Sequence, residues 1–173
     1  DTFDAVEAVM REAAACADFI VTSGGVSVGE EDHVKDVVAR LGALDLWKIA
    51  VKPGKPFAFG HVEGTPFIGL PGNPVSVYVT LLVIARGYLF ASQGAADTRV
   101  RAVQGRAAFS RRETSREEYI RVRSTGSGLE LYSNQSSGAL FSTCWSDGLV
   151  RQPSGTAIRE GDTVEYLPFQ AFL

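Results

Sequence analysis

Hydrophobic residues in the first half of the chain follow helical and strand-like patterns in turn. Apolar positions recur every three or four residues over 3–16 and over 33–41, whereas 19–22 and 44–51 are short, continuous apolar runs. Continuous runs of this length are typical of strands in a parallel sheet that helices cover on both faces. This half is therefore predicted to be an α/β domain.

A hairpin and a long helix follow. Residues 57–60 and 66–70 flank the polar turn 61–65, which predicts two antiparallel strands. A helix is predicted from Pro74 to about residue 90, with proline in its first turn. The helix is apolar on nearly every face, so we expect it to be buried in a core or against another subunit.

The pattern changes after 91–98, a linker of small and polar residues. Strand-like runs separated by Gly, Ser, Asp and Asn turns follow at 100–109, 118–124, 129–133, 149–153 and 162–167. They predict a small all-β, barrel-like domain, interrupted by a short helix within 137–145.

We therefore expect two domains, 1–92 and 99–173. The first should be an α/β domain with a mostly parallel sheet and flanking helices. Because it opens with a helix that no strand precedes, we expect it to be the C-terminal portion of a larger domain.

Composition limits the possible partners of the chain and its possible cellular compartments. The chain has 173 residues, 45% of them hydrophobic, and a net charge of −3, so neither nucleic acid nor a membrane is expected as a partner. No apolar run approaches the roughly 20 residues of a membrane span, and the acidic start does not resemble a signal peptide. Cys16 and Cys144 lack metal-ligand spacing, so a reducing cytoplasm is expected.

Three turns rich in glycine and proline carry the candidate chemistry, and each follows a predicted strand. The first contains Ser23, Gly24, Gly25 and Ser27, and the others are Lys-Pro-Gly-Lys-Pro at 52–56 and Gly-Leu-Pro-Gly-Asn-Pro at 69–74. Ligands of α/β sheets bind outside the carboxyl ends of the strands. Adjacent glycines let backbone N–H groups approach an anion, and a helix start adds a positive dipole end. The first turn is thus a candidate phosphate site, and the three turns are expected to line one rim.

Asp32, at the end of the first turn, is the candidate metal ligand. A carboxylate beside phosphates repels them unless a cation bridges the two, and Mg²⁺ held by one carboxylate plus substrate phosphates is the usual arrangement. The alternative is that Asp32 only caps the helix that follows. His33 and His61 have no second ligand at metal-binding spacing, so they are not expected to bind a metal.

Lysines are concentrated near the second turn. Lys48, Lys52 and Lys55 lie close together in a chain whose other basic residues, apart from Lys35, are arginines. Two prolines stiffen this loop, so it would present two cations to an oxyanion or a phosphate. Lys48 is at even spacing from Lys52 in the predicted strand, which places both on one face. The alternative is a solvated turn with incidental charge.

The β half contains a second charged segment. In it, arginines alternate with glutamates: Arg111, Arg112, Glu113, Arg116, Glu117 and Glu118. Interleaved charges of both signs favour a solvated hairpin over an anion site.

The three motifs, in this order, resemble the molybdopterin molybdenumtransferase family, the bacterial molybdenum insertases, and are similar to the gephyrin E domain. The resemblance rests on Ser-Gly-Gly-Val-Ser-Val-Gly followed by Asp32, on Trp47-Lys48 before Lys-Pro-Gly-Lys-Pro-Phe, and on Gly-Leu-Pro-Gly-Asn-Pro-Val-Ser. Residues 1–90 are similar to the latter part of the family's three-layer molybdopterin-binding domain, and 100–173 to its C-terminal β domain. The family's N-terminal domains and the first part of its cofactor-binding domain have no counterpart here.

The resemblance implies a reaction and a site. Family members take adenylylated molybdopterin and molybdate, insert molybdenum at the dithiolene sulfurs and release AMP, assisted by a divalent cation. By this likeness Asp32, Lys48, Lys52 and Lys55 would be catalytic. The implied substrate-binding residues are Ser23, Gly24, Gly25, Ser27, Pro71, Gly72, Asn73, Pro74, Ser76 and, from the β domain, Ser137 or its neighbour Ser136. A homodimer is also implied, because the family completes its cleft partly across a dimer.

Two other functions fit parts of the pattern. A molybdopterin adenylyltransferase has a similar glycine turn, although the appended β domain and the motif at 69–74 count against it. A scaffold that binds a peptide, like the gephyrin domain, would not need Asp32 and the lysines.

Overall fold

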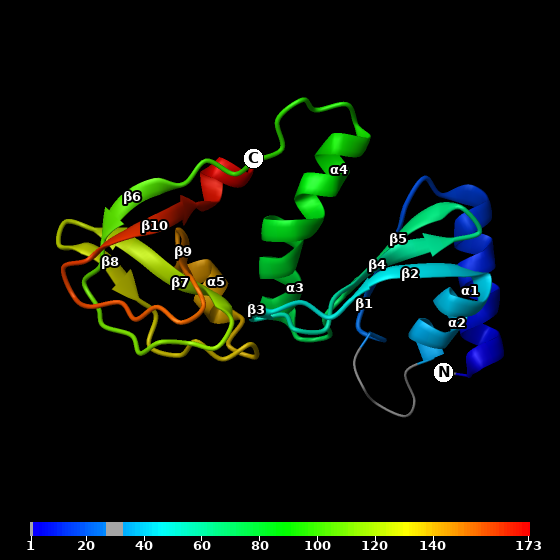
Figure 1. Cartoon of the computed structure of the whole chain (residues 1–173), viewed down its shortest axis with the longest axis horizontal. Coiled ribbons are helices and arrows are strands. Elements are labelled where there is room, and N and C mark those ends of the chain that lie inside the picture. The colour runs from blue at the N-terminus through cyan, green and yellow to red at the C-terminus, as the bar shows by residue number, and fades with distance from the viewer. Residues whose placement is uncertain (1, 27–32) are drawn as a thin grey trace. The chain divides into compact units, whose positions relative to one another are not determined.

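The computed structural model describes residues 2–26 and 33–173, and its contacts divide the chain into two compact units (Figure 1). The first unit is Asp1–Ile49 with Gly54–Thr80, and the second is Ala50–Pro53 with Leu81–Leu173. Elements of the first unit are α1 (Phe3–Cys16), β1 (Ile20–Ser23), α2 (His33–Leu41), β2 (Gly42–Trp47), β4 (Ala58–Val62), β5 (Thr65–Leu70) and α3 (Pro74–Thr80). Those of the second are β3 (Val51–Lys52), a π-helical turn (Leu81–Ala85), α4 (Arg86–Ser92), β6 (Val103–Arg106), β7 (Glu117–Thr125), β8 (Gly128–Leu131), α5 (Phe141–Trp145), β9 (Gly148–Gln152), β10 (Thr163–Pro168) and a final 3₁₀ turn (Phe169–Phe172).

The first unit contains a mixed four-stranded sheet in the order β1-β5-β4-β2. The α/β class is confirmed, but the expected mostly parallel sheet is wrong for the described residues. Only β1 and β5 run parallel there, whereas β4 pairs antiparallel with both β5 and β2. The predicted hairpin explains the difference, because a two-residue turn at Glu63 and Gly64 can join only antiparallel strands.

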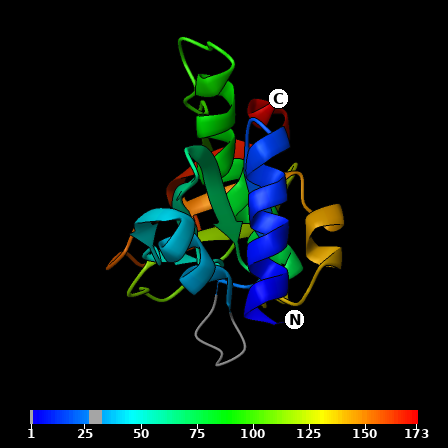
Figure 2. The same ribbon diagram turned by 90° about the vertical axis from the view of Figure 1, so that its right-hand side faces the viewer.

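Helices α1 and α2 cover one face of this sheet (Figure 2). Thr2 caps α1, and the apolar stripes of both helices pack on alternate residues of β4. Their shared core consists of Met10, Ile20, Val26, Val37, Val38, Ala58, Val62 and Phe67. Ile68 and Leu70 of β5 are also buried but do not belong to this cluster. Because successive residues of a strand face opposite ways, β5 is buried on both faces, and α3 contacts it as a third layer.

A continuous helical segment runs from Pro74 to Ser92, as the sequence predicts, with the π-helical turn in its middle. It spans 19 residues with a mean hydropathy of 1.6, so within the described residues it is one helix long and apolar enough to cross a membrane. This corrects the sequence-based statement that no apolar run approaches that length. One such helix is weak evidence for a membrane span, because core helices of soluble proteins meet the same criterion. The absence of a membrane partner stays a prediction.

The second unit is built on a six-stranded sheet. Its strands follow the order β3-β7-β9-β10-β6, and β8 pairs with β7. The core lies between these strands and includes Phe109, Ile120, Val150, Ile158 and Tyr166. The predicted small β domain and its short helix, α5, are therefore confirmed, but the described strands do not close into a barrel.

The predicted strand 44–51 is interrupted. β2 ends at Trp47, and Lys48 has φ of 67°, a left-handed conformation that breaks an extended strand. β3 then pairs in parallel with β7 of the second unit. The expectation that Lys48 and Lys52 share one face of one strand is therefore wrong.

Candidate active site

The first and third turns of the sequence motif lie side by side in the first unit. They follow the parallel strands β1 and β5, in which Ser23 is in register with Leu70. The Gly24 N–H donates to the Leu70 carbonyl oxygen at 3.0 Å. A Cβ atom built on Gly72 would lie 3.7 Å from the Cα of Gly24, so the two backbones approach closely. The predicted shared rim at the carboxyl ends of the strands thus holds for these two turns.

Glycine is required in the first turn. Gly24 and Gly25 have φ of 89° and 70°, a region that residues with a Cβ rarely enter. Successive unusual conformations of this kind can point neighbouring backbone N–H groups to one side, as anion-binding turns do. The arrangement suits a phosphate or another oxyanion.

Residues of the second turn also approach this rim. Gly54 has φ of 118°, and a Cβ atom built on it would lie 3.7 Å from Cγ of Pro71. The loop is closed at its base, because the Ile49 N–H donates to the Lys55 carbonyl oxygen at 3.0 Å. Lys48 and Lys55 are exposed.

The remaining predicted residues of the first unit differ in accessibility. Gly72, Asn73 and Pro74 are exposed, whereas Pro71 and Ser76 are buried. As placed, Ser76 does not present its side chain to a ligand in solvent. Ser27 and Asp32 lie outside the described residues, so their predicted roles stay predictions.

The magnesium expectation finds no support in the described residues. No group of three or more His, Cys, Asp or Glu side chains in 2–26 and 33–173 is placed to hold a metal ion. The expectation therefore rests on Asp32 alone.

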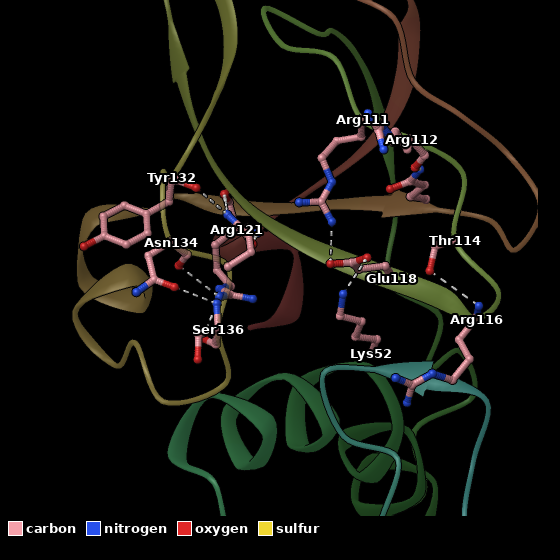
Figure 3. A network of polar contacts seen from close by, with 12 residues as sticks. Lys52, Arg111, Arg112, Thr114, Arg116, Glu118, Arg121, Tyr132, Asn134 and Ser136 are labelled. Atoms are coloured by element: carbon pink, nitrogen blue, oxygen red, sulfur yellow. Dashed lines mark hydrogen bonds and ion pairs between the residues drawn. The ribbon is translucent and has the colours of Figure 1, made fainter.

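Lys52 belongs to the second unit, where it meets a buried carboxylate. Its Nζ lies 3.4 Å from Oε2 of Glu118, and Nη2 of Arg111 donates to the other carboxylate oxygen at 2.7 Å (Figure 3). The Glu118 side chain is 2% exposed, against 46% for Lys52. The predicted solvated hairpin is therefore wrong for Glu118. Sequence reasoning missed this residue because charge alternation alone does not tell which glutamate of a strand faces inward.

A pocket of about 330 Å³ opens over this cluster. Lys52, Arg111 and Arg112 contribute cations to its lining, Glu113 and Glu118 contribute carboxylates, and Ser110 and Thr114 contribute hydroxyls. The lining carries one net positive charge and several hydrogen-bond donors. This combination is suited to an oxyanion.

The loop that carries Ser136 and Ser137 is fixed to β7 by Arg121. The guanidinium of Arg121 is fully buried and donates to the Ser136 carbonyl oxygen at 3.0 Å (Figure 3). It also donates to the Ser142 hydroxyl at 3.1 Å. Burial lowers the pKa of Arg121 to about 10, while the negative charge of Glu118 acts in the opposite direction. Arg121 thus stays charged at neutral pH. Nothing in the sequence distinguishes Arg121 from the other polar residues of an alternating strand.

Comparison with known families assigns both halves of the chain. Residues 1–91 match the family model described as "Probable molybdopterin binding domain", and 104–169 match "MoeA C-terminal region (domain IV)". Both matches confirm the resemblance seen in the motifs.

Relatives and solved structures agree with these matches. A molybdopterin molybdenumtransferase of Haemophilus influenzae is 54% identical over 78 residues, which cover 45% of this chain and 19% of that protein. The molybdenum cofactor synthesis protein cinnamon of Drosophila melanogaster is 33% identical over 92% of this chain and 28% of its own length. A crystal structure of a molybdopterin biosynthesis MoeA protein from Pyrococcus horikoshii superposes with a TM-score of 0.77 at 27% identity, covering 98% of this chain and 41% of that one.

The chain therefore spans less than half the length of these relatives. Its first 91 residues, more than half of its 173, match the family model, and its glycine turns meet at the ends of parallel strands. On these grounds the chain belongs to the molybdopterin-binding family of molybdenum cofactor biosynthesis, followed by a MoeA-type C-terminal region.

Proposed function

We propose that this chain is part of a molybdopterin molybdenumtransferase that inserts molybdenum into adenylylated molybdopterin and releases AMP. The observation that carries the proposal is the convergence of the turns at Gly24 and Gly72 at the carboxyl ends of β1 and β5. Backbone N–H groups of such turns bind the phosphates of a substrate. The relatives named as molybdenumtransferases support the same reaction class.

The lysines and Asp32 have distinct roles in the proposed reaction. Both molybdate and the phosphate linkage of the adenylylated substrate are negatively charged. Lys48, Lys52 and Lys55 neutralise this charge as the bond to AMP breaks, which lowers the barrier electrostatically. Asp32 activates the hydrolysis of the phosphate linkage. The backbone N–H groups of the rim hold the phosphates, and Ser137 or Ser136 contacts the substrate from the β domain.

Complementation tests the proposal. The full gene product that carries this chain should restore molybdoenzyme activity in a strain that lacks the transferase, at ordinary molybdate concentration. Asp32→Ala should abolish the restoration, while Asp18→Ala, a change to an acidic residue outside the motifs, should not. Release of AMP from adenylylated molybdopterin, dependent on molybdate, is the matching measurement in vitro.

Each alternative predicts a different result. An adenylyltransferase would consume ATP and form the adenylylated pterin instead of releasing AMP. A scaffold would leave complementation absent with the wild-type chain too. Equal complementation by Asp32→Ala and the wild type would remove Asp32 from the mechanism.

The homodimer and the cytoplasmic location stay predictions. The dimer is supported by the apolar helix from Pro74, because only 28% of its most apolar stretch is buried. Light scattering in solution should give twice the mass of the chain.

A further inference from the structure

Glu118 is held between two cations that come from different parts of the second unit. Lys52 reaches it from β3, which pairs in parallel with β7 so that Lys52 and Glu118 are in register. Arg111 reaches it from the segment before β7. That segment is fixed by two backbone hydrogen bonds between Arg111 and Ile158, at 2.7 and 3.0 Å. The position of the carboxylate is thus determined by three independently anchored backbones.

A buried, charged carboxylate of this kind is stable only when it has ion-pair or hydrogen-bond partners. A charge removed from water is costly unless ion pairs and hydrogen bonds compensate for it, and Glu118 receives both from Lys52 and Arg111. Lys52 is different, because nearly half of its side chain remains exposed. An ammonium group has three N–H donors, and the contact with Glu118 uses one of them. The remaining donors are available to a ligand in the pocket.

We propose that Glu118 is a positioning residue that holds the Lys52 ammonium toward the pocket lined by Arg111, Arg112, Ser110 and Thr114, where an oxyanion of the substrate binds. This inference rests on the proposed function, because it assigns Lys52 a role in that reaction. Lysine side chains lose much rotamer freedom when fixed. Because the contact with Glu118 forms when the protein folds, this entropy is lost before the substrate binds, and the cation is already in place.

The proposal predicts a specific kinetic signature for Glu118→Gln. Removal of the carboxylate raises the net positive charge of the pocket, so the KM for the anionic substrate should stay the same or fall. A freely rotating Lys52 should nevertheless lower kcat, on the order of tenfold to a hundredfold. If the variant instead lost structure, a smaller fraction of the enzyme would be active. Thermal unfolding and the yield of folded protein measure this loss.

Two comparisons isolate the action of Glu118 through Lys52. Glu117→Gln, one residue away, is the matched control, because Glu117 pairs with Arg151 instead. It should leave kcat within about twofold. In a Lys52→Ala background, Glu118→Gln should cause almost no further loss, because the group that Glu118 positions is gone. Additive losses would overturn the proposal.

A spectroscopic measurement separates this inference from the proposed function. The sequence contains four lysines, so ¹³Cε-lysine labelling of the chain gives four resolved NMR signals, and Lys52→Arg assigns one. The two Hε protons of Lys52 should have distinct shifts in the wild type and in Glu117→Gln. They should merge in Glu118→Gln, while Lys35, which stands over the Trp47 ring, should not change.

The outcomes are distinct. If Lys52 gives the same signals with and without Glu118, the positioning role is wrong, whatever the activity. If the Lys52 signals respond but the wild type releases no AMP, the positioning role stands and the proposed reaction fails. Glu118→Asp keeps the charge but withdraws it by one methylene, and it replaces Glu118→Gln if that variant does not fold. The same merging of signals is expected.

Discussion

At the scale of single residues, the rim of the first unit requires glycine at only one of the two positions where its turns meet. Gly24 has φ of 89°, which a residue with a Cβ adopts only with strain. Gly72 is in a conformation open to other residues, and a Cβ on it would make an ordinary contact of 3.7 Å with Gly24. Backbone conformation therefore distinguishes two glycines that look equivalent in the sequence.

This distinction predicts different effects of alanine at the two positions. Gly24→Ala should lower the free energy of unfolding by about 1–2 kcal/mol, because of the left-handed backbone. Gly72→Ala should change it by less than about 0.5 kcal/mol. Urea unfolding of the chain measures both. Equal losses in the two variants would show that contact with the neighbouring turn, and not φ, requires the glycines.

At the scale of elements, β7 organises the second unit through alternate residues on its two faces. Glu117 pairs with Arg151 and accepts a hydrogen bond from the Tyr119 hydroxyl, which is two residues further on the same face. Burial, followed by this hydrogen bond to Glu117, raises the pKa of Tyr119 above its ordinary value. Glu118 and Ile120 are buried on the other face. One strand thus supplies the carboxylate beneath Lys52 and part of the apolar core.

Arg121 of β7 also binds the loop that carries the predicted Ser136 or Ser137 contact. Its guanidinium also donates to the Asn134 carbonyl oxygen at 3.4 Å, and its backbone N–H and carbonyl pair with the Gln135 side chain. Among the described residues, the hydrogen bonds that join 134–136 to β7 therefore all involve Arg121 or Gln135.

Arg121→Met should destabilise the chain by about 3 kcal/mol, because carbonyl oxygens of the loop lose their charged donor. Arg123→Met is the matched control. Arg123 is exposed and stacks on Trp145, so its loss should cost about 1 kcal/mol or less. Amide hydrogen exchange should show faster exchange of residues 134–138 in Arg121→Met only. Unchanged exchange there would mean that the loop is held by other contacts.

At the scale of the whole molecule, the described residues form two hydrophobic cores made of separate residue sets. The core of the first unit includes Phe67, and that of the second includes Ile120, both fully buried. A unit with its own core can lose stability locally.

Core truncations should therefore act within their own unit. Ile120→Ala is expected to cost about 2–5 kcal/mol and Phe67→Ala about 3–5 kcal/mol. Hydrogen exchange should accelerate mainly in β7, β9 and β10 for Ile120→Ala, and mainly in β4 and β5 for Phe67→Ala. Uniform acceleration along the chain in both variants would show that the two units unfold as one.

Much of the fold was predictable because it depends on local patterns. Helix α1 follows from apolar spacing after the Thr2 cap, the hairpin from its polar turn, and the helix from Pro74 from its proline and its apolar length. The strand 44–51 was predicted wrongly at Lys48, because the apolar pattern does not indicate that this residue has a left-handed backbone conformation. The mostly parallel sheet was also predicted wrongly, since a short apolar run does not show whether its neighbours in the sheet run parallel or antiparallel.

The sequence by itself determined the family, the glycine turns and the concentration of lysines, because these are matters of residue type and spacing. Only the tertiary structure decided which turns meet and which charges are buried. Gly24 and Gly72 are separated by 48 positions and adjoin through parallel pairing of β1 and β5. Lys52 faces Glu118 because β3 pairs with β7, 66 residues further along the chain. Such contacts arise from long-range strand pairing, which local sequence does not specify.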